Sequence, residues 1–80
     1  MKLYLISQEV NDDYDTYSDA VVCAENENDA KLIRPDGKEC KENIDNYDSW
    51  CALRDVKCEY IGEAKQELKR GVVCASFHAG

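Results

Sequence analysis

Five cysteines and a single histidine are the residues of this 80-residue chain that most readily act as nucleophiles or metal ligands. They are Cys23, Cys40, Cys51, Cys58, Cys74 and His78. No two of the cysteines form a Cys-x-x-Cys pair, and one histidine is too few for the common mixed zinc sites. The sequence therefore predicts neither a metal site nor a cofactor.

A thiol catalyst would require a histidine next to a cysteine. Cys74 and His78 are four residues apart on one predicted strand, and that spacing of roughly 13 Å is too long for a catalytic dyad. Cys58 would suit only if it lay opposite His78 on a neighbouring strand, which the sequence leaves open. The chain also has no glycine-rich phosphate loop and no hydrolase elbow. We predict that the protein is not an enzyme.

The cysteines also indicate a compartment. An odd number of them, without an export signal, favours free thiols in a reducing cytosol. Cys23, Cys58 and Cys74 lie in apolar, strand-like patterns, where cysteine acts as a small hydrophobic residue. Cys40 and Cys51 lie in a polar stretch. We expect these last two to be the exposed, reactive or bridged thiols.

Acidic residues are concentrated at the start of the chain, where Leu3 to Ala30 contain eight acids and no base. With Lys2, residues 1–30 carry a charge of −7, which equals the net charge of the whole chain. A field of this sign repels nucleic acids and membrane surfaces and favours basic partners. The alternative is a solvated acidic surface that only keeps the domain soluble.

Residues 11–15, Asn-Asp-Asp-Tyr-Asp, resemble the start of a calcium-binding EF-hand loop. That loop requires glycine at its sixth position and glutamate at its twelfth. Thr16 and Val22 occupy these positions here. We therefore interpret the segment as a solvated acidic turn.

Aromatic residues accompany the acidic ones. Tyr14 and Tyr17 lie among the N-terminal acids, and Tyr47 and Trp50 lie in a second irregular stretch. Tyrosine and tryptophan combined with carboxylates suit a surface that binds a basic protein. The alternative is that these rings pack onto the domain, with Trp50 anchoring a loop to the core.

Alternating and apolar patterns predict strands over residues 2–7, 19–24, 55–61 and 72–77. The first and last of these are apolar on both faces, so we expect them to be central strands. The third is half exposed, with Val56, Cys58 and Tyr60 directed inward.

A short helix is predicted after Asn26, which is a favourable N-cap, with Asp29 at the third helical position. Pro35 limits this helix to two turns. The order β-β-α-β-β predicts a single α+β domain over residues 1–80, an antiparallel four-stranded sheet with the helix on one face. The other face is expected to be exposed or covered by residues 36–54.

Four stretches of the chain carry a family resemblance: residues 14–17 (Tyr-Asp-Thr-Tyr), 20–24 (Ala-Val-Val-Cys-Ala), 61–64 (Ile-Gly-Glu-Ala) and 71–77 (Gly-Val-Val-Cys-Ala-Ser-Phe). Through these four stretches, the sequence from Lys2 to Gly80 resembles a group of small phage and prophage proteins of unassigned function. These motifs are structural rather than chemical, so the resemblance implies a phage origin and a reducing bacterial cytosol.

Charge and resemblance together suggest a binding protein that inhibits a host nucleic-acid-handling complex, such as CRISPR–Cas, by presenting an acidic surface to a basic nucleic-acid channel. Direct contact with nucleic acid or membranes is not expected. The predicted partner-binding residues are Asp12, Asp13, Tyr14, Asp15, Tyr17, Asp19, Glu27 and Trp50. The alternative is a non-inhibitory phage accessory protein that self-associates, as a homodimer, through its sheet.

Overall fold

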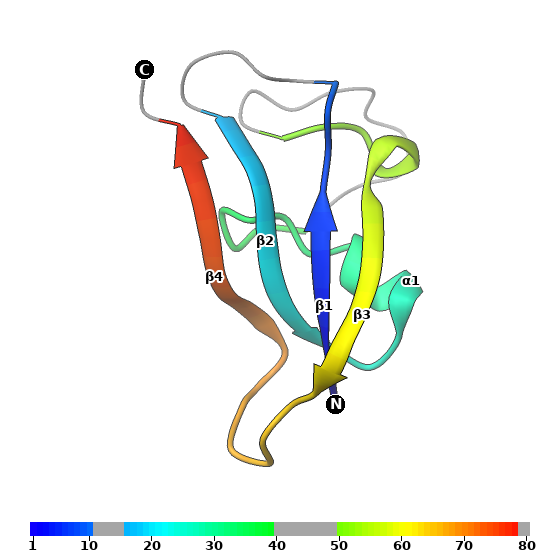
Figure 1. The fold of residues 1–80 in the computed structure, drawn as a ribbon, viewed down its shortest axis with the longest axis vertical. Helices are drawn as coiled ribbons and strands as arrows, with labels where there is room; N and C mark the ends of the chain where they lie inside the picture. The colour runs from blue at the N-terminus through cyan, green and yellow to red at the C-terminus, as the bar shows by residue number, and fades with distance from the viewer. Residues whose placement is uncertain (11–15, 40–49, 79–80) are drawn as a thin grey trace.

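The computed structural model describes residues 1–10, 16–39 and 50–78, with the backbone alone for residues 77 and 78. Its elements are β1 (Lys2–Ser7), β2 (Thr16–Ala24), α1 (Glu27–Lys31), the 3-10 helix η1 (Leu53–Asp55), β3 (Lys57–Glu63) and β4 (Gly71–His78). The strands form one antiparallel sheet in the order β3-β1-β2-β4 (Figure 1). The predicted α+β fold with one short helix on the sheet is confirmed.

β1 and β2 form the centre of the sheet and pair as a hairpin, from Lys2 opposite Ala24 to Ser7 opposite Asp19. The central position of β1 agrees with the sequence prediction. β2 begins earlier than predicted, at Thr16, because its first residues pair with the end of β4. Local alternation does not report such a long-range partner.

The prediction that the last strand is central was wrong, since β4 is an edge strand paired only with β2. Apolar residues on both faces indicated burial on both sides. Here Val72 packs against the core, whereas Val73, Cys74 and Ala75 are exposed. The apolar pattern of β4 therefore does not correspond to burial within this chain.

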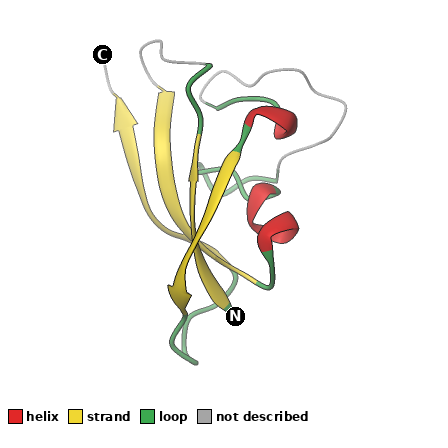
Figure 2. Ribbon diagram, turned by 45° about the vertical axis from the view of Figure 1, so that its right-hand side comes forward, coloured by secondary structure: helices red, strands yellow, loops and turns green. Residues whose placement is uncertain are grey.

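Strand register divides the side chains between two faces. Tyr4 lies between Tyr60 and Val22, and Ile6 lies between Cys58 and Ala20, on the face that α1 covers. Figure 2 shows both helices on this one side of the sheet. We call the opposite side the open face.

The helix is short, and its N-terminus is capped as predicted. The Asn26 Oδ1 accepts a hydrogen bond from the Asp29 backbone N–H at 2.8 Å. In return, the Asp29 carboxylate accepts one from the Glu25 backbone N–H at 3.1 Å, one residue before the cap. α1 ends at Lys31 and contributes Ala30 to the core. Most of the apolar side chains that cover this face of the sheet must therefore come from other segments of the chain.

Residues 50–56 supply that cover. Trp50 is completely buried and belongs to the same core cluster as Ile6 and Val22, which confirms the anchoring interpretation. Cys51 is also completely buried, so the expectation that it is exposed was wrong. The polar residues before it in sequence did not indicate that this short segment turns inward to fill the space beside α1.

Truncation of Ile6 should show how strongly the covered face stabilises the domain. Ile6 has 0% exposure, so Ile6→Ala leaves a cavity and should lower the free energy of unfolding by about 2–5 kcal/mol. Ile61→Ala removes the same atoms from a side chain that is 45% exposed and should cost less than about 1 kcal/mol. Urea denaturation followed by circular dichroism measures both, and equal losses would contradict the assignment of the core.

Candidate functional site

The acidic segment, residues 9–19, contains five carboxylates and no base. Of its predicted partner-binding residues, Asp12, Asp13, Tyr14 and Asp15 lie outside the described residues. The described residues on either side show how the chain enters and leaves this part of the hairpin.

Gln8 joins the two sides of the hairpin at this end. Its side chain is almost completely buried; Nε2 donates to the Tyr17 carbonyl oxygen at 2.9 Å, and Oε1 accepts from the Val10 N–H at 2.9 Å. The Gln8 backbone N–H donates to the Ser18 carbonyl oxygen at 3.2 Å. Sequence reasoning missed this residue, although a polar residue directly after an apolar strand is a usable signal for such a bond.

Tyr17 and Asp19 are the predicted partner-binding residues that the structure describes near this end. Tyr17 is half-buried and packs against the core cluster, so only part of its ring is available to a partner. Asp19 is half-buried on the open face, in register with Ser7 on one side and Ser76 on the other. Both belong to β2.

Glu27 lies elsewhere. It begins α1, beyond the far end of β2, on the side of the sheet opposite Asp19. Its carboxylate pairs with the Lys31 ammonium group at 3.6 Å within the helix. Trp50 is in the core. The structure therefore separates Glu27 from Asp19 and leaves no part of Trp50 exposed, while Tyr17 packs against the core cluster to which Trp50 belongs.

Ion pairs reduce the charge asymmetry that the sequence suggests. Lys57 contacts the Glu9 carboxylate at 3.0 Å, and Arg70 contacts Asp29 at 2.9 Å and Glu39 at 2.8 Å. Hydrogen bonds from Arg70 to Glu39 and Asp29 raise the pKa of its guanidinium further above its usual range. Cations from later in the chain therefore offset two of the N-terminal acids, Glu9 and Asp29. Exposed pairs of this kind contribute little stability, so their main effect here is on the distribution of charge.

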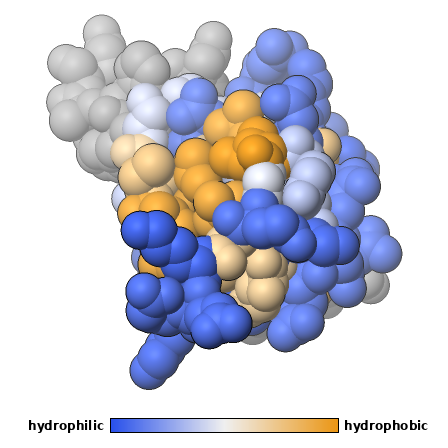
Figure 3. Space-filling model, turned by 60° about the horizontal axis from the view of Figure 1, so that its bottom comes forward, coloured by the Kyte–Doolittle hydropathy of each residue, from blue (hydrophilic) through white to orange (hydrophobic). Residues whose placement is uncertain are grey.

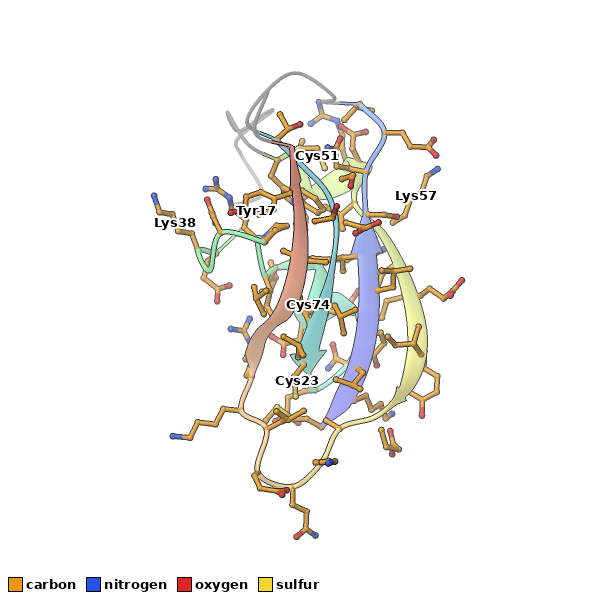
Figure 4. All side chains as sticks on the ribbon, turned by 60° about the vertical axis from the view of Figure 1, so that its left-hand side comes forward. Tyr17, Cys23, Lys38, Cys51, Lys57 and Cys74 are labelled. Atoms are coloured by element: carbon orange, nitrogen blue, oxygen red, sulfur yellow. The ribbon has the colours of Figure 1, made fainter. Side chains whose placement is uncertain are left out.

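Four free thiols are described, and they do not form a reactive group. Cys23 and Cys51 are buried, Cys58 is half-buried and Cys74 is exposed on β4; Figure 4 shows Cys51, Cys74 and Cys23 at separate heights along the sheet. The apolar, strand-like pattern around Cys74 therefore does not place this residue in the core. Cys40 lies outside the described residues.

The strand order of the sheet also decides whether Cys58 and His78 can be neighbours. Cys58 is on β3 and His78 is on β4, and these strands are the two edges of the sheet with β1 and β2 between them. Three strand spacings separate the edges by roughly 14 Å. Cys58 and His78 are therefore not cross-strand neighbours.

A shallow cavity of about 380 Å³ lies between α1 and η1. Its lining residues are Asn28, Lys31, Leu32, Leu53 and Arg54. Within the described ranges, no group of three or more histidine, cysteine, aspartate or glutamate side chains is arranged to hold a metal ion. No described helix is long and apolar enough to cross a membrane.

Comparisons of the chain with protein-family models, with curated proteins and with solved structures gave no match. The resemblance to small phage proteins therefore remains a prediction. Any function must be argued from the surfaces described above.

Native-state thiol labelling should follow the burial of the four described cysteines. At low protein concentration we expect Cys74 to react first and Cys58 more slowly. Cys23 and Cys51 should react only when the chain unfolds, because a reagent must reach the sulfur atom. Mass spectrometry of peptides from timed samples gives the order, and rapid labelling of Cys51 in folded protein would contradict its burial.

The Cys58 thiol should also make stability depend on pH. Burial, followed by the negative charge of Glu27, raises the pKa of Cys58 above its ordinary value of 9.0. The unfolded chain then loses this proton first as the pH rises. The contribution to stability is complete below about pH 9 and is lost as the pH rises through the raised folded-state pKa. Compared with Cys58→Ala, the wild type should lose more stability between neutral and alkaline pH; identical pH profiles would exclude the effect.

Proposed function

We propose that this protein is a small phage-type binding protein that inhibits a host nucleic-acid-handling complex, with a CRISPR–Cas complex as one example. The acidic segment would occupy a basic channel that otherwise holds DNA or RNA. The proposal places the protein in the cytosol of the bacterial host and assigns it no catalytic step.

The supporting observation is the concentration of acids in the acidic segment, which contains no base. Glu27 and Asp29 each contact a cation at 4 Å or less. The acidic segment contains five acids, and its Glu9 carboxylate pairs with Lys57 at 3.0 Å. Asp19 is the last acid of this segment and lies on β2. It has no ion pair within the described part of the chain. Five of the eight acids between Leu3 and Ala30 therefore lie in this one segment of the chain.

The mechanism is competition by charge. A channel that binds phosphates carries clustered lysine and arginine, and carboxylates at similar spacing compete for the same cations. Tyr17 would add an aromatic contact through the exposed part of its ring. Glu27 and Trp50 are not part of this surface, for the reasons of position given above. Long-range attraction accelerates such an encounter and is screened by salt.

Neutralising the acidic segment tests the proposal. The variant Asp12→Asn, Asp13→Asn, Asp15→Asn keeps the side-chain shapes and removes three charges, so we expect partner affinity to fall at least about tenfold. Immobilised protein would be exposed to a bacterial lysate at low and high salt, and each retained complex would then be assayed for DNA or RNA binding with and without the protein. Retention should decrease with salt, and nucleic-acid binding should be inhibited.

The matched control is Glu59→Gln, Glu63→Gln, Glu67→Gln, which removes the same charge from exposed positions outside the acidic segment. This variant should retain the partner within about twofold, because only general attraction is weakened. Equal inhibition by the wild type and by a folded asparagine variant would refute the proposal. Equal loss in both triple variants would reduce it to non-specific charge attraction.

A further inference from the structure

The outer edge of β4 has backbone groups with which no described strand pairs. β4 pairs with β2 alone, so its side away from β2 is an outer edge of the sheet. Figure 4 views the molecule from this side and shows no described strand or helix in front of β4. An unpaired edge of this kind is a template for a further strand.

Hydrogen bonding within the sheet shows which residues of β2 bond to β4. The Gln8 N–H donates to the Ser18 carbonyl oxygen, in the register that pairs β1 with β2. In antiparallel pairing, the residues of a central strand that bond to one neighbour alternate with those that bond to the other. From Ser18 onward, the even-numbered residues of β2 therefore bond to β1. Asp19 and Val21 are left to bond to β4.

The same alternation assigns the outward backbone groups of β4. Asp19 and Val21 are in register with Ser76 and Cys74, so the backbones of Ser76 and Cys74 bond to β2. Ala75 lies between them, and its N–H and C=O therefore point away from β2. Ala75 is exposed, and no described strand lies on that side. One donor and one acceptor are thus accessible at the middle of this edge.

The side chains of β4 offer no barrier to a second strand. Residues 71–77 contain no charged residue and no proline. Val73 is 47% exposed, and residues 74–76 are exposed and small. Figure 3, a view from the end that carries the β3–β4 connection, shows apolar side chains at the surface with hydrophilic residues around them. A long, uncharged and exposed edge strand is the kind that pairs with another chain.

The opposite edge of the sheet differs in this respect. β3 has exposed side chains of both signs, at Lys57, Glu59 and Glu63. Charged side chains are a common protection of an edge strand against pairing with another chain. β4 lacks this protection.

A bulge can also protect an edge, and β4 has one register shift. Val72 is in register with Val22 and Cys74 with Val21, so the extra residue is Val73. Beyond it, residues 74–76 pair regularly with residues 21–19 of β2. The regular part of the edge is therefore centred on Ala75.

We propose that the outer edge of β4 pairs with β4 of a second copy of this chain, antiparallel and with the two Ala75 residues opposite each other. Each Ala75 N–H would donate to the Ala75 carbonyl oxygen of the other copy. The two four-stranded sheets would then form one continuous eight-stranded sheet. Neither the acidic segment nor Tyr17 takes part, so the dimer is independent of the proposed inhibitory function.

Symmetry and charge favour a second copy as the occupant. Two identical strands that pair antiparallel are related by a two-fold axis, so one surface supplies both halves of the interface. With Ala75 opposite Ala75, Cys74 lies opposite Ser76, and no charge faces another. Contact between other surfaces must overcome the net charge of −7 on each copy.

The acids nearest to this interface also stay apart in the dimer. Asp19 is the only acid of β2, and β4 has none. Three strand spacings, roughly 14 Å, would separate the two Asp19 residues across the combined sheet. That distance exceeds the screening length of about 8 Å at physiological salt. Pairing through β4 therefore joins two acidic chains without bringing their strand carboxylates together.

Removal of the outward N–H is the first test. Ala75→Pro deletes this donor but no bond to β2, and proline is tolerated where the N–H side of an edge strand faces solvent, so the monomer should fold. The dimer should weaken at least about tenfold, because both central hydrogen bonds are lost. The matched control Ala75→Val keeps the N–H and favours strand structure, so it should dimerise at least as well as the wild type. Sedimentation velocity over a concentration series, with circular dichroism for folding, measures all three proteins.

Charge pairing is the second test and is specific to the register. Ala75→Lys and Ala75→Glu should each weaken the dimer, because like charges would lie directly opposite each other. An equimolar mixture of the two variants should form a mixed dimer. The control mixture of Val10→Lys and Val10→Glu carries the same charges at a side chain that is 57% exposed and outside the sheet. It should associate within about twofold of the wild type, since separated surface charges are screened.

Three outcomes would overturn the inference. They are a wild type that is monomeric at every soluble concentration, a folded Ala75→Pro variant that dimerises like the wild type, and a mixture of Ala75→Lys and Ala75→Glu that associates no better than either alone. The two proposals fail separately. A monomeric Ala75→Pro variant should still inhibit, and the variant Asp12→Asn, Asp13→Asn, Asp15→Asn should still dimerise.

Discussion

The register of the β1–β2 hairpin is the constraint on which the rest of the structure depends. Pairing from Lys2 opposite Ala24 to Ser7 opposite Asp19 puts Tyr4, Ile6, Ala20 and Val22 on one face. A slip of one residue would turn the other face of β2 inward and carry Asp19 to the side that α1 covers. Burial of an unpaired carboxylate is costly, so the apolar pattern and the charge specify the same register. Gln8 reinforces it through hydrogen bonds with Tyr17, Ser18 and Val10, at the end of the hairpin where the strands leave the sheet.

The core is completed by residues that are distant in sequence. α1 has only five residues and buries only Ala30, which is too little to cover four strands. Trp50, Cys51 and Val56 fill the remaining space and lie within one cluster with Ile6 and Val22. The domain therefore has a single apolar layer on one side of its sheet. On its other side, Leu5 and Val21 lie beside the charged residues Glu59 and Asp19, and no described helix covers them.

Asp19 lies between the acidic part of the chain and the apolar residues of the sheet. Towards the hairpin end lies Glu9, which pairs with Lys57, and towards the sheet centre lie Val21 and Leu5. The long-range pair of Arg70 with Asp29 offsets one of the N-terminal acids at the start of α1. A surface with charge at one end and apolar residues next to it can use the first for attraction and the second for affinity.

The sequence by itself determined the elements and the fold class. Alternation located the four strands, and Asn26 with Asp29 located the start of the helix, because these signals arise from neighbours a few residues apart. For the candidate site, the sequence identified the acidic segment and Tyr17, but not the bonds that Gln8 makes. Only the tertiary structure decided that β4 is an edge, that Cys51 is buried and that Glu27 is separated from Asp19. These outcomes depend on which distant segments come into contact, and local periodicity contains no information about such contacts.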